Sequence, residues 1–176
     1  MSESTRRHKA NAPSQLRFAI FTCSTSRYQL RQKAKPVEDV SGDLIESKLK
    51  EAGNTIALRE LLSDEKTMIQ KAVEEALNRD DLDAVIFNGG TGVTKTDVTI
   101  ETVAPVLEKT LPGFGEIFRR LSFDDIGSAA VLSRASAGVA KRKVFFCIPG
   151  SPDAVRLCLE RLILPEAAHI VKHARE

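Results

Sequence analysis

Two patterns of apolar residues alternate along the chain. Short runs of consecutive apolar residues, rich in β-branched and aromatic side chains, cover residues 16–23, 84–88 and 144–148, and a looser run covers residues 56–61. Such runs are typical of strands that are buried on both faces. Between them, apolar residues recur at three- and four-residue spacing, as on one face of a helix. This alternation predicts an α/β protein with a mostly parallel sheet.

Residues that start or stop helices bound the helical stretches. Ser41-Gly42-Asp43 opens the first stretch, and Gly53 ends it. Ser63 or Asp64 can cap the second stretch, which ends near Asn78. The apolar positions of the predicted helices are Leu44, Ile45 and Leu49; Met68, Ile69, Ala72, Val73, Ala76 and Leu77; Ile100, Val103 and Leu107; Phe114, Ile117, Phe118 and Leu121; and Val155, Leu159 and Leu162.

Two polar stretches stand outside this alternation. Residues 1–15 contain few apolar side chains and are expected to form a disordered tail. Residues 16–176 are then a single domain, because a chain of 176 residues can build one core but not two comfortable ones. Residues 24–39 are polar, with four basic side chains and no apolar periodicity. This segment is expected to be either a mobile surface loop or a lid over an anionic substrate.

The most informative motif follows the run at residues 84–88. Gly89-Gly90-Thr91-Gly92 places three glycines in four positions, so the chain can turn sharply and expose backbone N–H groups to a phosphate. A helix predicted to start near Thr99 would add its dipole. Asp97 lies beside this loop, where a carboxylate suits either Mg²⁺ or the orientation of a reacting group. The loop matches neither the P-loop nor the dinucleotide fingerprint, and a tight strand-to-helix turn explains it equally well.

A second glycine turn follows the apolar run at residues 144–148. Pro149-Gly150-Ser151-Pro152 leads from this strand into a helix, and right-handed crossovers place such turns along one edge of a parallel sheet. The two glycine turns and the turn at residues 22–27 are therefore expected to form a crevice for a nucleotide-like ligand. A valine at Gly90 or Gly150 is expected to block the ligand with little loss of fold.

The composition argues against nucleic-acid and membrane partners. The 26 Lys and Arg against 24 Asp and Glu leave a net charge of +2, and there is one Tyr and no Trp, so nothing indicates a nucleic-acid partner. No apolar run reaches the roughly 20 residues that span a bilayer, which predicts no membrane association and a cytoplasmic protein.

The cysteines and histidines give weaker signals. Cys23, Cys147 and Cys158 form no CxxC pair and are expected to be reduced, the first two as small buried hydrophobes. His169 and His173 have the i, i+4 spacing of metal ligands on a terminal helix. Because no third ligand accompanies them, a solvated helix face is the preferred interpretation.

Several ordered motifs together resemble the MoaB/MogA family of molybdenum cofactor biosynthesis, which includes the molybdopterin adenylyltransferases and the equivalent domains of gephyrin. The resemblance extends over roughly residues 16–165 and is closer to the MoaB branch. The matching motifs are Gly89-Gly90-Thr91-Gly92 with Asp97-Val98-Thr99, Pro112-Gly113-Phe114-Gly115-Glu116, Ser133-Arg134, Pro149-Gly150-Ser151-Pro152 and, for the MoaB branch, Ser41-Gly42-Asp43, Ala52-Gly53 and the segment from Phe118-Arg119 to Leu121-Ser122.

This resemblance implies a doubly wound, three-layer α/β sandwich with a mostly parallel sheet. It also implies that ATP, with Mg²⁺, adenylylates molybdopterin and releases pyrophosphate. The implied site consists of Gly89, Gly90, Thr91, Gly92, Ser133 and Arg134 for phosphate or pterin binding, Ser24, Pro149, Gly150, Ser151 and Pro152 for the nucleotide, and Asp64 and Asp97 for catalysis or Mg²⁺ coordination.

Some of these residues have plain structural alternatives. Asp64 and Asp97 each stand where a helix N-cap is also expected. Ser133-Arg134 suits a phosphate, through the forked guanidinium, or a structural ion pair. Ser24-Thr25-Ser26-Arg27 lacks the acid of the Ser-Asp-Arg-like segment that family enzymes commonly carry. A non-catalytic molybdopterin-binding or assembly protein of the same pathway is therefore the second hypothesis.

The segment from Phe114 to Val131 is more apolar than one short helix face requires, with Ile117, Phe123 and Ile126 among its side chains. These residues either share the core of the monomer or bury themselves against a neighbour. We expect a closed homo-oligomer, and the resemblance favours a hexamer over a trimer.

Overall fold

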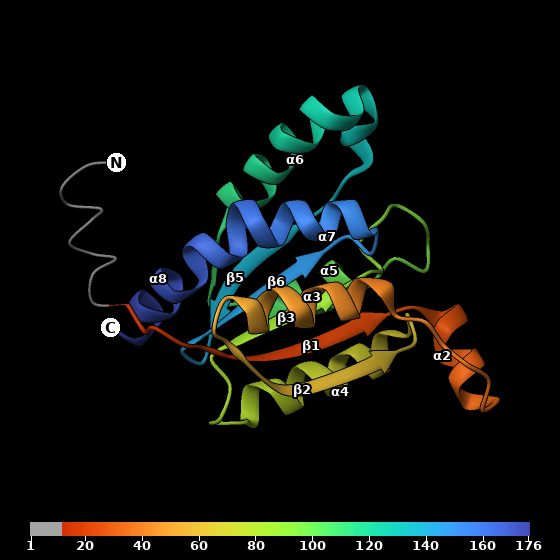
Figure 1. The fold of residues 1–176 in the computed structure, drawn as a ribbon, viewed down its shortest axis with the longest axis horizontal. Helices are drawn as coiled ribbons and strands as arrows, with labels where there is room; N and C mark the ends of the chain where they lie inside the picture. Colours follow the sequence, from red (N-terminus) through yellow and green to blue (C-terminus); the bar gives the residue numbers. More distant parts are fainter. Residues whose placement is uncertain (1–11) are drawn as a thin grey trace.

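The computed structural model describes residues 12–176 and has a central six-stranded sheet with helices on both faces (Figure 1). This is the predicted three-layer α/β sandwich. The strands lie in the order β2-β1-β3-β6-β5-β4; the first four are parallel, and β5 and β4 are antiparallel to their neighbours. Their bounds are Arg17–Cys23 (β1), Thr55–Leu62 (β2), Ala84–Asn88 (β3), Lys109–Thr110 (β4), Ser136–Ala140 (β5) and Lys143–Ile148 (β6).

The central strand β3 shows why the apolar runs form parallel strands. All five of its residues are buried, and successive side chains enter opposite cores. Ala84 and Ile86 pack with α3, α6, α7 and α8, whereas Val85 and Phe87 pack with α4 and α5. The helices are α2 (Thr25–Gln32), α3 (Val40–Glu51), α4 (Lys66–Asn78), α5 (Thr99–Val103), α6 (Pro112–Ile126), α7 (Pro152–Cys158) and α8 (Leu164–Arg175), with 3₁₀ turns η1 (Ala104–Val106) and η2 (Gly127–Leu132) and a π-helical turn η3 (Leu159–Ile163).

Most elements lie where the apolar pattern predicts them, but one helix end and two strands at the edge of the sheet differ. The helix expected to reach Leu107 ends at Val103 and continues as a 3₁₀ turn that contains Pro105, a residue with no N–H to donate to the helix. The pattern also missed strands β4 and β5, because β4 has two residues and β5 consists mainly of small side chains. Both lie at the antiparallel edge of the sheet.

Residues 24–39, which were expected to form a surface loop or a lid, contain a helix. Helix α2 occupies Thr25–Gln32 without burying a single side chain. Its first backbone amide, that of Thr25, donates to the Asp64 carboxylate at 2.8 Å, so the helix is anchored at its start by a residue from a different part of the sheet edge. A contact distant in sequence thus stabilises a helix with no apolar face.

The remaining expectations concern the termini and the thiols. The disordered tail predicted for residues 1–15 falls mostly on residues 1–11, which lie outside the described residues. None of the helices between residues 12 and 176 combines the length and apolar character needed to cross a bilayer. Cys23, Cys147 and Cys158 carry free thiols, and Cys23 and Cys147 are buried, as predicted; Cys158 is buried as well, and burial raises the pKa of Cys23 to about 12.

Asp83 links the first strand to the last helix at the amino edge of the sheet, and its side chain is only 5% exposed. Its carboxylate accepts hydrogen bonds from the Arg17 amide at 2.7 Å and the Arg17 Nη2 at 3.1 Å, and a further one from Arg175 at the end of α8. Burial alone would raise the pKa of Asp83, but the hydrogen bonds from Arg17 and Arg175 outweigh it and hold the pKa below its usual value.

We expect Asp83→Ala to lower the free energy of unfolding by about 2 kcal/mol, and Tm by about 5 °C, because charge-assisted hydrogen bonds are lost. Since the pKa of Asp83 is lowered in the folded state, this stabilisation is complete above the ordinary aspartate pKa and is lost as the pH falls through the folded-state pKa. Urea unfolding at neutral and acid pH tests both points. The exposed neighbour Asp80 provides the control, and equal destabilisation by Asp80→Ala would contradict the prediction.

Candidate functional site

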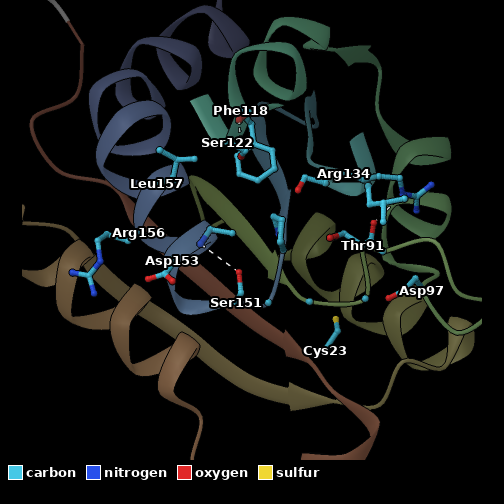
Figure 2. A pocket seen from close by; sticks show the side chains of 18 of the residues that line it. Cys23, Thr91, Asp97, Phe118, Ser122, Arg134, Ser151, Asp153, Arg156 and Leu157 are labelled. Atoms are coloured by element: carbon cyan, nitrogen blue, oxygen red, sulfur yellow. Dashed lines mark hydrogen bonds between the residues drawn. The ribbon is translucent and has the colours of Figure 1, made fainter. Parts of the chain in front are cut away.

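A pocket of about 930 Å³ opens at the carboxyl edge of the sheet, where parallel strands end (Figure 2). It is lined by Cys23 at the end of β1 and Ser24 after it, by Asp64 after β2, by the glycine loop after β3, and by the turn after β6. The three turns therefore converge as the crossover argument predicts. Helices α6 and α7 form the opposite wall.

The glycine loop is bound to the strands on either side of it. The Gly89 amide donates to the Ile148 carbonyl of β6 at 2.9 Å. Gly89 has φ +100°, and a Cβ there would lie 2.3 Å from the Cys23 carbonyl oxygen of β1. Thr99 closes the loop from the other end, since its amide donates to Gly90 O at 3.0 Å and its hydroxyl to Gly89 O at 2.9 Å. Glycine is thus required here for geometry, whatever the loop binds.

The expectation that a valine at Gly90 would leave the fold largely intact is wrong. Gly90 has φ +62°, and a Cβ would lie 2.4 Å from Thr99 Oγ1 and 2.9 Å from Asp64 Oδ1. Both the strained backbone and the collision would disturb the loop. At Gly150 a Cβ would lie 3.3 Å from the Cα of Gly89, a tight but less severe contact.

Asp97 belongs to the loop and does not cap the helix that follows. Its Oδ2 accepts hydrogen bonds from the Thr94 amide at 2.9 Å and the Thr94 hydroxyl at 2.6 Å, and Val98 takes the N-cap position of α5. Burial opposes ionisation, but these bonds, with the Gly92 amide and the charge of Arg134, hold the pKa of Asp97 below its usual value. With only five residues, α5 contributes a smaller dipole than the predicted helix.

Asp64 also differs from the N-cap interpretation. Its Oδ2 accepts from the amide and the hydroxyl of Thr25, both at 2.8 Å, while Glu65 takes the N-cap position of α4. Its other oxygen faces Gly90, as the 2.9 Å approach to a Cβ at that position shows. The structure therefore places two carboxylates against the glycine loop, Asp64 at Gly90 and Asp97 at Gly92.

Arg134 forms a structural ion pair, the alternative to phosphate binding that the sequence left open. Its Nε donates to the Thr91 carbonyl at 2.8 Å, and its Nη1 forms an ion pair with Glu101 at 2.7 Å. The guanidinium therefore connects the glycine loop to α5 while lining the pocket, where Figure 2 shows it beside Thr91 and near Asp97. Ser133 lines the pocket as well.

The predicted nucleotide-binding residues lie together, with one exception. Ser24 is fixed by its amide, which donates to Leu62 O at 2.9 Å. The Gly150 carbonyl accepts from the Ser41 hydroxyl of α3 at 2.7 Å, and Ser151 caps α7. Pro149, Gly150 and Ser151 line the pocket, whereas Pro152, the first residue of α7, does not.

Helix α7 and the turn η3 form a whole wall of the pocket that the apolar pattern did not predict. Six of their residues line it: Ala154, and five at positions i, i+3, i+4, i+7 and i+8, which are Asp153, Arg156, Leu157, Glu160 and Arg161. This mixed polar spacing immediately after a glycine turn was the available signal. Phe118 and Ser122 of α6 complete the wall.

The charges that line the pocket are mixed. Arg27, Arg134, Arg156 and Arg161 provide guanidinium groups, and the carboxylates come from Asp64, Asp97, Asp125, Asp153 and Glu160. Guanidinium groups and backbone amides suit phosphates, whereas carboxylates suit a cation bound with them. This arrangement can hold an extended anionic ligand together with a divalent metal ion.

Comparisons with known proteins show which family shares this sequence and fold. Residues 19–169 match the model of a family described as a probable molybdopterin binding domain. The chain is 48% identical over 168 residues to molybdenum cofactor biosynthesis protein B of Bacillus anthracis, covering 95% of each sequence. It is 40% identical over 161 residues to a probable molybdopterin adenylyltransferase of Methanocaldococcus jannaschii, covering 92% of this chain and 95% of the relative.

A solved structure shows the same fold. The tungsten cofactor synthesizing protein MoaB from Pyrococcus furiosus superposes with a TM-score of 0.82 at 38% identity, covering 94% of this chain and 100% of that one. The match of the family model over most of the chain, the similarity of full-length relatives and the shared fold establish that this protein belongs to the MoaB/MogA family of molybdenum cofactor biosynthesis proteins.

Proposed function

We propose that this protein is a molybdopterin adenylyltransferase that uses ATP and Mg²⁺. The observation that carries the proposal is the pair of carboxylates, Asp64 and Asp97, which lie against a glycine loop and line the same pocket. The name of the relative from Methanocaldococcus jannaschii supports the same activity. We also propose that the pocket-lining residues act in the roles that the resemblance implies.

In this reaction an oxygen of the terminal phosphate of molybdopterin attacks the α-phosphorus of ATP. A new P–O–P bond forms, the bond between the α-phosphorus and its bridging oxygen breaks, and pyrophosphate leaves with that electron pair. Because two anions must meet, catalysis depends chiefly on positioning and charge neutralisation. The glycine loop and the side chains of Arg27 and Arg156 line the pocket, and their backbone amides and guanidinium groups can provide both.

The carboxylates fit Mg²⁺. Mg²⁺ prefers oxygen ligands and is commonly bound by one or two carboxylates together with substrate phosphates. Within residues 12–176 no cluster of three or more metal-binding side chains forms, which suits an ion that takes its remaining ligands from phosphates and water. When bound, Mg²⁺ would neutralise charge that develops on the phosphates. Asp64 and Asp97 would hold it, and their hydrogen bonds to Thr25 and Thr94 keep them oriented.

The deciding experiment incubates the purified protein with molybdopterin, ATP and Mg²⁺ and measures adenylylated pterin and pyrophosphate. Formation of both products in equal amounts is expected. Tight binding of molybdopterin without either product would instead support a non-catalytic binding or assembly protein. This alternative is favoured by the segment Ser24-Thr25-Ser26-Arg27, which lacks the acid that family enzymes commonly carry after the first strand.

We expect Asp97→Asn to lower kcat roughly 100-fold while the KM for ATP changes little. The substitution removes the charge that would hold the metal, but it also reduces repulsion of the anionic substrates. Steady-state kinetics with the folded variant test this. Asp81→Asn, which removes an exposed carboxylate outside the pocket, is the control, and wild-type kcat for Asp97→Asn would end the assignment.

We further propose that the protein forms a closed homo-oligomer, with a hexamer preferred over a trimer. The apolar set of residues 114–132 divides in two. Phe118 is buried and Phe114 packs on Phe146, so part of the set does belong to the monomer core. The remainder is exposed on α6 and η2: Ile117 (51%), Phe123 (54%), Ile126 (54%), Val131 (78%) and Leu132 (61%). So much adjacent exposed apolar surface favours a protein partner.

The oligomer proposal predicts that Phe123→Asp combined with Val131→Asp reduces the mass in solution to the 19.3 kDa of one chain, because charges would be buried at the interface. Light scattering during gel filtration measures this. Val40→Asp, at another exposed valine, should leave the mass unchanged. A monomeric wild-type protein would overturn the proposal, and a trimer would overturn only the preference for six.

A further inference from the structure

His169 and His173 of α8 face each other on the surface of the helix. Their Nε2 atoms are 3.0 Å apart, and their ring centroids are 4.8 Å apart with planes at 62°. The side chains are 23% and 43% exposed. The i, i+4 spacing predicted a solvated helix face. In the structure the two histidines of that face form a close pair whose side chains are partly exposed to solvent.

The other nitrogen of each ring faces a carboxylate. His169 Nδ1 lies 3.3 Å from Glu166 Oε2, and His173 Nδ1 lies 2.8 Å from Glu176 Oε2. An ionised carboxylate can only accept a hydrogen bond, so each Nδ1 carries the proton and each Nε2 of a neutral ring is left with a lone pair. Two lone pairs 3.0 Å apart repel each other unless a proton or a metal ion lies between them.

The carboxylate contacts also match the surroundings of metal-binding histidines. A histidine that binds a metal through one nitrogen nearly always donates its other N–H to a carboxylate, a carbonyl or water, which fixes the tautomer and raises the basicity of the ligand. Here both rings have such a carboxylate, Glu166 and Glu176. This second feature is independent of the i, i+4 spacing.

The distance between the nitrogens indicates which metals fit. With metal–nitrogen bonds of about 2.05 Å, two nitrogens 3.0 Å apart subtend an angle of about 95° at the metal. A tetrahedral ion would need roughly 3.4 Å between them at the same bond length. An angle near a right angle suits the square-planar or tetragonal coordination of Cu²⁺ and Ni²⁺.

This pair lies far from the pocket in the architecture of the fold. The last turn of α8 is bound to the amino edge of the sheet through Arg175 and Asp83. In Figure 1, α8 lies at the end of the sheet opposite the strand arrowheads, whereas the pocket is at the carboxyl ends. An ion bound by α8 would therefore not take part in the chemistry of the pocket.

We propose that His169 and His173 form a surface site for a divalent transition-metal ion, with Cu²⁺ and Ni²⁺ preferred, that is separate from the proposed adenylyltransferase site. Glu166 and Glu176 orient the two rings. Among residues 12–176 no group of three or more His, Cys, Asp and Glu side chains could hold the ion, so the proposed site rests on the two imidazoles, and its other coordination positions are open to further ligands such as water. An ion that bridges two successive turns of α8 also stabilises the end of this helix.

The test uses the full chain without an affinity tag, in a buffer free of chelators. Calorimetric titration with NiCl₂ alone is expected to show saturable binding that disappears in His169→Gln and in His173→Gln. With CuCl₂, electron paramagnetic resonance should show coupling to two imidazole nitrogens in the wild-type protein and to fewer in each variant. Glu176→Gln should weaken binding roughly 10-fold through the orientation of His173. A hundredfold excess of Ni²⁺ over its Kd should raise the wild-type Tm by about 5 °C.

Matched controls separate this site from the others. His8 is the third histidine of the chain, and His8→Gln should retain the wild-type affinity for Ni²⁺ if the site consists of His169 and His173 alone. Asp97→Asn should also retain it, because the pocket is not involved. Equal loss of affinity in His8→Gln and His169→Gln would overturn the assignment. Absence of binding at millimolar Ni²⁺ would overturn it too, and a proton shared between the two rings would then explain their close approach.

Discussion

Three backbones meet without an intervening side chain at Gly89, and the rest of the site depends on this contact. A Cβ at Gly89 would collide with the Cys23 carbonyl, and a Cβ at Gly150 would press on the Cα of Gly89. The hydrogen bond from the Gly89 amide to Ile148 then joins the end of β3 to the end of β6. Because these strand ends approach so closely, the turns that follow them open into one pocket instead of separate surface loops.

The polar side chains of the pocket are held in place by protein contacts before any ligand arrives. Thr94 orients Asp97, Thr25 orients Asp64, and Glu101 orients Arg134. Each of these contacts also serves the fold, since it closes a loop, starts a helix or connects α5 to the glycine loop. Structural and functional interpretations of these residues are therefore compatible. A preorganised polar site needs little rearrangement when charge develops during a reaction.

The charged groups at the carboxyl ends of the strands differ in their surroundings from those at the amino ends. At the carboxyl edge the chain leaves the strands through glycine turns, and the charged groups there face a cavity. At the amino edge Asp83 is nearly buried, and its partners Arg17 and Arg175 join the first strand to the last helix. Charge is therefore satisfied within the protein at one edge and is available to ligands at the other. The histidine pair of α8 lies near the amino edge, yet we propose that it binds a ligand, a metal ion.

The sequence by itself determined the layers of the fold and the edge at which the site forms. Apolar runs and helical periodicity record burial directly, so they located β1, β3 and β6 and most of the helices. The glycine turns at residues 89–92 and 149–152 marked the carboxyl edge because few other residues allow such turns. The order of motifs along the chain also indicated the family, which the comparisons confirm.

Only the tertiary structure decided which partners the polar groups have. Helix α2 depends on Asp64, which lies 39 residues from Thr25 in the chain, and no local pattern contains that contact. Asp64 and Asp97 suited helix caps by position, yet their carboxylates turn to Thr25 and Thr94. The wall formed by α7 was missed because a solvated face and a pocket-lining face have the same polar spacing. Hydrophobic patterning records what is buried, whereas the direction of a carboxylate or an imidazole is set by groups that only the folded chain brings near.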